Sequence, residues 1–193
     1  PHFIFNSLNS IKLYIINNEK ENAVYYLNKF SKFIRKILIA STEKEISLED
    51  ELDTMQLYMN IENIRFSNEI DFQVNVDKNI NTASIKVPSL ILQPFLENSL
   101  WHGLSSKKED KKIVLNVSKT SDEFVTISII DNGIGRNASA KINDNKLLKR
   151  KSVGLAITKA RLANFSKGFT NSYKIDIEDL YNETNKAIGT KVV

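Results

Sequence analysis

The chain has 193 residues, 41% of them hydrophobic, which is enough for one large domain or for a small module plus a medium one. The net charge of +4, with basic and acidic residues interspersed, gives no indication of direct nucleic-acid binding. The absence of cysteine excludes disulfides and thiolate metal sites, and no stretch reaches the roughly 18 apolar residues of a transmembrane helix. Because the chain begins with Pro1 rather than Met, we expect a fragment whose membrane anchor, if it has one, lies outside these residues.

Residues 1–41 show the apolar spacing of two helices, with a turn at Asn17-Asn18. In the first helix the apolar stripe consists of Ile4, Leu8, Ile11 and Ile15. In the second it consists of Ala23, Leu27, Phe30, Ile34 and Ile37. A hairpin of two helices is too small to bury these stripes alone, so we expect a second copy of the chain to complete a four-helix bundle.

The next segment predicts a connecting helix. The charged stretch Thr42–Ile46 breaks the hairpin, and Ser47 then begins the sequence SLED, which resembles a capping box with Asp50 in place of the usual Glu. The apolar pattern that follows predicts a helix to about Phe66.

From Asp71 onward the apolar period changes to two, which is typical of strands with one buried face. Alternation predicts four strands, at Phe72–Val76, Ile113–Val117, Val125–Ile129 and Tyr173–Ile177. Between them we expect one helix opened by Pro88 and running to about His102, and another from Gly154 to Lys167. This order predicts an α+β sandwich with a mixed, mainly antiparallel sheet covered by helices on one face.

The segment Asp131-Asn132-Gly133-Ile134-Gly135 follows a predicted strand directly. Its two glycines allow tight turns and close approach to a ligand, and the aspartate can accept a hydrogen bond from an exocyclic amine. An ordinary turn that ends a strand is the alternative. Gly133, Gly135 and Ala138 also match a GxGxxA dinucleotide fingerprint, but no acid follows at the required distance and a basic loop replaces the helix.

The helix predicted from Pro88 carries a polar side formed by Glu97, Asn98, Trp101 and His102. An amide oxygen such as that of Asn98 is a suitable ligand for Mg²⁺, which commonly keeps phosphates and waters in its shell. The alternative is an amphipathic helix with a polar outer face.

Two further glycines lie where a ligand could approach. Ser152-Val153-Gly154-Leu155 leads into the last predicted helix, whose N-terminus would attract phosphate, and Gly189-Thr190 indicates a turn into a final strand. The basic stretch between Arg136 and Lys151 is either a solvated loop or a lid over phosphates. Its other basic residues are Lys141, Lys146, Lys149 and Arg150. With no Walker loop, no HExxH motif and only two histidines, a conventional phosphate loop and a His-rich metal site are excluded.

Taken in order, these pieces resemble the GHKL ATP-binding fold of histidine kinases, DNA gyrase and mismatch-repair ATPases. The N box of that fold resembles Leu92–Gly103, its glycine boxes resemble Asp131–Gly135 and Val153–Ile157, and its final element resembles Gly189-Thr190. The N-terminal sequence Pro1–Asn9 closely resembles the phosphoacceptor box of LytS/YehU-type sensor histidine kinases.

That resemblance implies three parts, namely a dimerising phosphoacceptor hairpin at residues 1–45, a connecting helix at 46–68 and an ATP-binding domain at 69–193. It implies catalytic roles for His2, as phosphoacceptor, and for Glu97, which would polarise a nucleophile or order the N box. Asn98 would hold Mg²⁺. Nucleotide contacts are implied for Asn98, His102, Asp131, Gly133, Gly135, Gly154, Leu155 and Thr190. Helix geometry adds that His2 lies on the side opposite the Ile4 stripe.

The family resemblance further implies ATP and Mg²⁺ as cofactors, a homodimer, and transfer of the phosphoryl group to an aspartate of a response regulator of the LytTR type. It implies the cytoplasmic part of a bacterial membrane sensor. Three positions depart from the family pattern, namely Phe3, Ser152 and Ile157. Phe3 stands where better-known histidine kinases carry an acid, which leaves the general base open. A nucleotide-binding scaffold without transfer activity and another GHKL ATPase remain alternatives.

Overall fold

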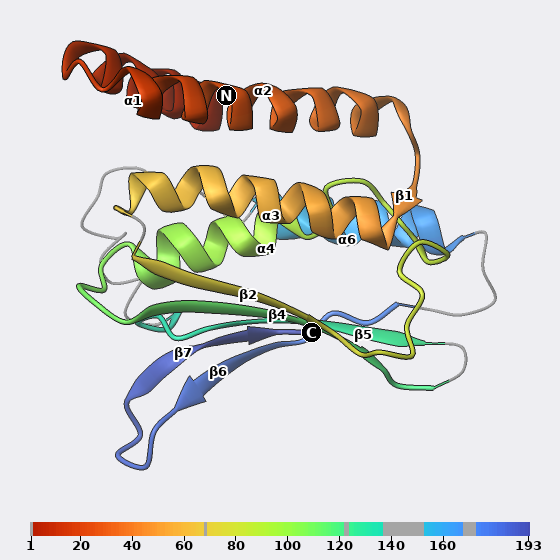
Figure 1. Cartoon of the computed structure of the whole chain (residues 1–193). Helices are drawn as coiled ribbons and strands as arrows, with labels where there is room; N and C mark the ends of the chain where they lie inside the picture. The colour runs from red at the N-terminus through yellow and green to blue at the C-terminus, as the bar shows by residue number, and fades with distance from the viewer. Residues whose placement is uncertain (1, 68, 122–123, 137–152, 168–172) are drawn as a thin grey trace.

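The computed structural model describes residues 2–67, 69–121, 124–136, 153–167 and 173–193, without the side chains of His2 and of 153–155. Figure 1 shows three layers: a long hairpin, a layer of helices beneath it, and a sheet whose upper face these helices cover. The hairpin consists of α1 (His2–Ile16) and α2 (Lys20–Thr42). The helix layer consists of α3 (Leu48–Arg65), α4 (Gln93–Asn98), its π-helical continuation η1 (Ser99–Leu104) and α6 (Val153–Ser166).

The main sheet has five strands in the order β2-β4-β5-β7-β6, and only the β2–β4 pair is parallel. The strands are β2 (Ile70–Val76), β4 (Lys111–Lys119), β5 (Val125–Asp131), β6 (Ile177–Tyr181) and β7 (Ala187–Val192). A separate two-stranded ladder joins β1 (Ile46–Ser47) to β3 (Lys86–Val87). The predicted α+β sandwich with a mixed, mainly antiparallel sheet is confirmed.

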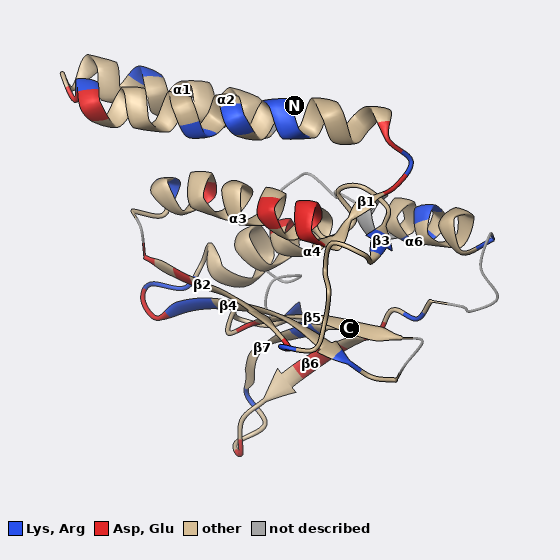
Figure 2. Ribbon diagram, turned by 45° about the vertical axis from the view of Figure 1, so that its right-hand side comes forward, with Lys and Arg blue, Asp and Glu red and all other residues tan. Residues whose placement is uncertain are grey.

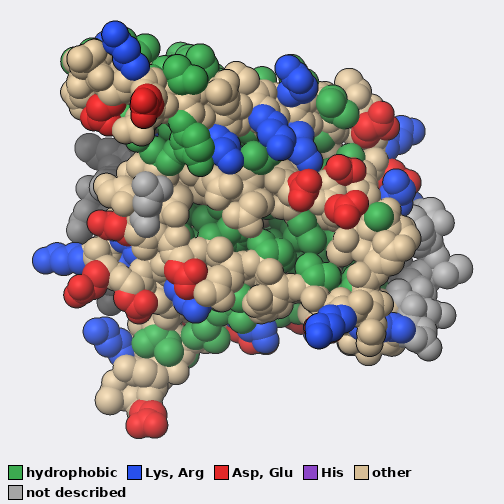
Figure 3. Space-filling model, in the orientation of Figure 1, with side chains coloured by type: hydrophobic (Ala, Val, Ile, Leu, Met, Phe, Trp, Pro, Cys, Tyr) green, Lys and Arg blue, Asp and Glu red, His purple; other side chains and the backbone are tan. Residues whose placement is uncertain are grey.

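The core lies between the helix layer and the sheet, and Figure 3 shows hydrophobic side chains between the two. On β4 the alternate residues Ile113, Leu115 and Val117 are buried, as their spacing predicts. Leu96, Leu100 and Leu104 of α4 and η1 are fully buried in the same core, so the helix that carries the predicted N box is anchored by every fourth residue.

Helix α3 begins as the sequence predicts. The Ser47 hydroxyl accepts a hydrogen bond from the Asp50 amide at 3.0 Å and donates one to the Asp50 carboxylate at 2.7 Å. Ser47 therefore caps the helix, and Asp50 takes the place of the Glu of a capping box.

Three predicted boundaries are wrong. The helix expected from Pro88 begins only at Gln93, because the preceding residues pair as β3 and then turn, with Leu90 at a φ of 56°. The strand expected from Tyr173 begins at Ile177, where pairing with β7 begins. Gly189-Thr190 lies inside β7 rather than at a turn before it.

The apolar stripe predicted for α1 divides between two environments. Ile11 is buried, and the packed face of the helix continues through Ser7 and Phe3, whose ring lies 4.9 Å from that of Phe33 and 5.4 Å from that of Tyr58. By contrast Ile4 and Leu8 are nearly half exposed. The hairpin thus packs on α3 through aromatic rings and leaves a second apolar face uncovered.

Charge also joins the hairpin to α3. The Lys36 ammonium of α2 lies 3.4 Å from the Asp53 carboxylate and 3.8 Å from that of Asp50. Figure 2 shows basic residues on α2 above the acidic first turns of α3. Among the helices of the described residues, none is both long enough and apolar enough to cross a membrane.

Candidate functional site

The carboxylate of Asp131, at the end of β5, is the centre of the candidate site. It is 4% exposed, and it accepts hydrogen bonds from the Ser99 hydroxyl and from the Gly133 amide, both at 2.9 Å. Thr190 of β7 is its register partner across the sheet. The site therefore joins the predicted N box, the first glycine box and the final strand around one buried carboxylate.

Glycines make this close assembly possible. A Cβ at Gly133 would lie 2.5 Å from the Gly103 Cα, and a Cβ at Gly189 would lie 2.0 Å from the Asp131 carbonyl oxygen. Gly189 also has a φ of 154°, which side chains rarely adopt. These backbones touch only because no Cβ separates them, so each of these glycines is required by packing.

Burial raises the pKa of the Asp131 carboxyl, while the hydrogen bonds from Gly133 and Ser99, together with the charge of Lys107, oppose that rise. The Lys107 ammonium donates to the Asn132 carbonyl at 2.9 Å and so lies beside the same turn. A carboxylate fixed by two donors in a dry setting is well suited to recognise a hydrogen-bond donor of a ligand.

Glu97 and Asn98 are neighbours in sequence but face different surroundings. Asn98 is exposed at the end of α4 and precedes Ser99, whose hydroxyl binds Asp131. The Glu97 carboxylate accepts a hydrogen bond from Gln93 at 2.8 Å and lines a cavity of about 280 Å³ that it shares with Phe3 and Asn6 of α1. Glu97 therefore faces the beginning of the predicted phosphoacceptor helix.

Three other predicted residues are placed by the fold. His102 is exposed in η1, one residue before Gly103. Gly135 has a φ of 78°, and a Cβ there would lie 2.6 Å from the Ala187 Cβ, so it packs against β7. Thr190 is half-buried beside Asp131.

Gly154 and Leu155 belong to the first turn of α6, as expected, but the Leu155 side chain lies outside the described part of the structure. The same holds for the side chain of His2, the first residue of α1. The basic residues between Lys141 and Lys151, together with Ser152, also lie outside the described residues.

Sequence reasoning missed Ser99 and Gly103 as members of the site. Ser99 falls on the apolar side of its helix, where a hydroxyl among leucines signals a buried hydrogen bond. Gly103 ends the N-box segment, but only the folded chain shows that a Cβ there would lie 2.9 Å from an Asp131 carboxylate oxygen.

A second buried carboxylate fixes the turn that precedes α4. Glu51 of α3 is fully buried and accepts hydrogen bonds from the amides of Leu90 and Leu92 at 2.8 and 2.9 Å. Arg161 of α6 donates to the carbonyl and the hydroxyl of Ser89 in the same turn. This turn thus connects α3, the helix that carries the predicted N box, and α6, whose first residues are the predicted second glycine box.

Glu51 should make stability depend on pH in a defined direction. Burial raises its pKa above the unfolded value of 4.5, so the folded chain binds this proton more tightly. We therefore expect the difference in free energy of unfolding, native chain minus Glu51→Gln, to decrease as pH rises from 4.5 through the raised pKa. The decrease should be about 1.4 kcal/mol for each unit by which folding raises the pKa of Glu51. Urea unfolding at several pH values measures this difference, and a rise with pH would contradict it.

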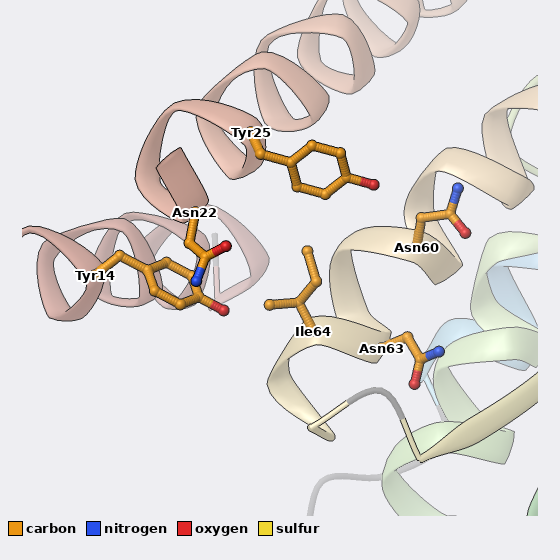
Figure 4. Close-up of a pocket in the computed structure, with 6 residues that line it drawn as sticks. All are labelled: Tyr14, Asn22, Tyr25, Asn60, Asn63 and Ile64. Carbon is orange, nitrogen blue, oxygen red and sulfur yellow. The ribbon is translucent and has the colours of Figure 1, made fainter. Parts of the chain in front are cut away.

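A larger hollow, about 340 Å³, lies between the hairpin turn and the end of α3. Figure 4 shows Tyr14, Asn22 and Tyr25 of the hairpin facing Asn60, Asn63 and Ile64 of α3. None of the predicted site residues lines this hollow, so we do not assign it as the candidate site although it is larger.

Comparison with known proteins agrees with these observations. A histidine kinase family model matches residues 1–70. The sensor protein LytS of Oceanobacillus iheyensis is 35% identical over 135 residues, which are 70% of this chain and 22% of that protein. LytS of Enterococcus faecalis is 30% identical over 173 residues, which are 90% of this chain and 28% of that protein.

A solved bacterial phosphotransferase aligns with 100% of this chain and 90% of its own, at 12% identity and a TM-score of 0.51, and this likeness concerns the fold alone. The chain spans about a quarter of the length of the LytS proteins that it matches. The family model and the sequence similarity to these proteins nevertheless agree, and the chain belongs to the LytS-type sensor histidine kinases.

Proposed function

We propose that the chain is the catalytic core of a sensor histidine kinase that binds Mg-ATP and phosphorylates its own His2. The observation that carries this proposal is the buried Asp131 carboxylate, held by Ser99 and Gly133 and packed against the Gly103 backbone, in a helix segment that also carries Asn98. In this proposal residues 1–45 form the phosphoacceptor hairpin, residues 46–68 the connecting helix and residues 69–193 the ATP-binding domain.

Asp131 would accept a hydrogen bond from the adenine amine, with Gly133 and Gly135 forming the floor of the pocket and Thr190 and His102 its wall. Its low exposure supports this role, because an exchange of hydrogen bonds inside a dry site discriminates strongly between ligands. The amides of the first turn of α6, at Gly154 and Leu155, would meet the phosphates, as helix N-termini commonly do.

The residues present fit a magnesium ion held mainly by its substrate. Asn98 offers one exposed amide oxygen, and the described residues contain no cluster of three or more histidine, cysteine or acidic side chains. Such a site suits Mg²⁺, which is commonly bound by one or two protein oxygens together with phosphates and waters. When bound, the ion would neutralise charge on the phosphates.

In the proposed transfer, a neutral ring nitrogen of His2 attacks the γ-phosphorus, the bond between that phosphorus and the bridging oxygen breaks, and ADP leaves. The phosphorylated ring then loses its surplus proton to a base. Glu97 is a candidate for that base, since its carboxylate shares a cavity with the residues next to His2 on α1. The other contribution to the reaction is the positioning of the nucleotide, which the cluster of residues around Asp131 would supply.

The hairpin would pair with a second copy of the chain through its uncovered apolar face. The exposed apolar residues of the hairpin are Ile4, Phe5, Leu8, Leu13, Ile15, Ile16, Val24, Leu27, Leu38 and Ile39. Exposed apolar side chains in this number are typical of an interaction site. The phosphoryl group would pass to an aspartate of a response regulator of the LytTR type, and the chain would form the cytoplasmic part of a membrane sensor.

Incubation with γ-labelled Mg-ATP tests the proposal. We expect label on the chain that is stable in base and lost in acid, which is the behaviour of phosphohistidine. Nucleotide binding without any label would favour a scaffold without transfer activity, and release of free phosphate would favour a GHKL ATPase. Either outcome would refute the kinase.

A further inference from the structure

Trp101, a residue of the predicted N box, packs against side chains at the end of α3. One guanidinium nitrogen of Arg65 donates to both carboxylate oxygens of Glu62, at 2.8 and 3.0 Å, and Glu62 is 1% exposed. The guanidinium carbon of Arg65 lies 4.6 Å from the centroid of the Trp101 ring. The ring of Phe66 lies 5.6 Å from the same indole. Trp101 is therefore held against α3 by a stacked cation that is itself anchored on a buried carboxylate.

Trp101 lies three residues after Asn98, inside the π-helix η1. Wide helical turns of this kind are rare and often occur at functional sites. The inner side of this segment is fixed by Ser99 and Gly103 at Asp131. On its outer side Trp101 contacts Arg65 and Phe66, so the position of the indole depends on these two side chains.

The indole has room to move if it is released. Trp101 is 40% exposed and lines the cavity of about 280 Å³ into which Glu97 also faces. A ring that loses its stacked cation can shift into that space, and the Asn98 side chain, three residues away on the same side of the helix, can then shift with it.

We propose that Arg65 is a positioning residue for Asn98, because it clamps Trp101 and so fixes the orientation of the N-box segment. This inference rests on the proposed role of Asn98 as a ligand of the nucleotide-bound magnesium ion. It assigns Arg65 no contact with the nucleotide.

The test compares ADP binding with and without Mg²⁺ in the native chain and in Arg65→Lys. Lysine keeps a positive charge near Glu62 but lacks the planar group that stacks on the indole. We expect the affinity for Mg-ADP to fall about tenfold, while the affinity for ADP in the presence of EDTA does not change. Because Trp101 is the only tryptophan, its fluorescence reports the clamp directly, and we expect a red shift and stronger quenching by iodide.

Two variants complete the test. Arg35→Lys makes the same exchange at an exposed position of α2 and should change neither measurement. Trp101→Leu removes the stacked ring without altering the Glu62–Arg65 pair, so it should show the same selective loss of Mg-ADP affinity even if Arg65→Lys fails to fold.

The outcomes separate the two proposals. A native chain that binds ADP equally well with and without magnesium refutes the role of Asn98, and the positioning role of Arg65 with it. A native chain whose affinity does depend on magnesium, with that dependence retained in Arg65→Lys and in Trp101→Leu, refutes the role of Arg65 alone.

Discussion

Replacing His2 with glutamine should reduce phosphorylation of the chain by about 1000-fold or more, because the amide offers no nucleophilic ring nitrogen. ADP affinity should be unchanged, because Asp131 and its partners come from β5, β7 and the N box and not from α1. The expected result is therefore a loss of phosphorylation without a loss of ADP affinity. A loss of both would indicate that the hairpin supports the fold of the nucleotide site.

The chain has only two histidines, so the second one provides the comparison. His102→Gln should still yield acid-labile label, with a weaker affinity for nucleotide if His102 contacts it as proposed. Label that persists in His2→Gln and disappears in His102→Gln would instead make His102 the acceptor. Labelling at saturating Mg-ATP, followed by acid treatment, distinguishes these results.

Local chemistry explains which elements could be predicted. The Ser47 cap and the alternation on β4 depend on residues close in sequence, and both are confirmed. The predicted first residue of the helix that carries the N box was wrong, because groups distant in sequence determine where this helix begins. Glu51, 39 and 41 residues away, binds the amides of Leu90 and Leu92 and holds the chain after Pro88 in a turn.

The same distinction applies to β6 and to the site. Alternation at Tyr173 and Ile175 continues ahead of the strand, but no strand in the described part of the chain pairs with these two residues, and the ladder begins at Ile177. At the site, the residue types Asp131, Gly133 and Asn98 could be identified from motifs. The contributions of Ser99, 32 residues from Asp131 in the chain, and of Gly103 could not, because they arise from contacts distant in sequence and from a π-helical turn that no sequence pattern indicated.

The Gly189→Ala substitution should have the largest effect on stability of any single methyl addition in the site. Its Cβ would lie 2.0 Å from the Asp131 carbonyl oxygen, a backbone atom that cannot rotate away, and the φ of 154° adds strain. Strands β5 and β7 pair at this point, so they must separate to admit the methyl group. We expect the free energy of unfolding to fall by about 3 kcal/mol, with a parallel loss of ADP binding. Ile188→Ala, at the neighbouring exposed position of β7, should have little effect on either measurement.

Alanine at two further glycines should destabilise the fold less than Gly189→Ala does. A Cβ at Gly133 would meet the Gly103 backbone at 2.5 Å, so Gly133→Ala should also destabilise the fold, although its φ adds no strain. A Cβ at Gly103 would meet the Asp131 carboxylate oxygen at 2.9 Å, and a side chain can shift. Gly103→Ala should therefore leave urea unfolding nearly unchanged while ADP affinity falls about tenfold. Equal losses of stability in all three variants would contradict this order, and unchanged ADP affinity in Gly103→Ala would mean that the Asp131 carboxylate does not bind the nucleotide.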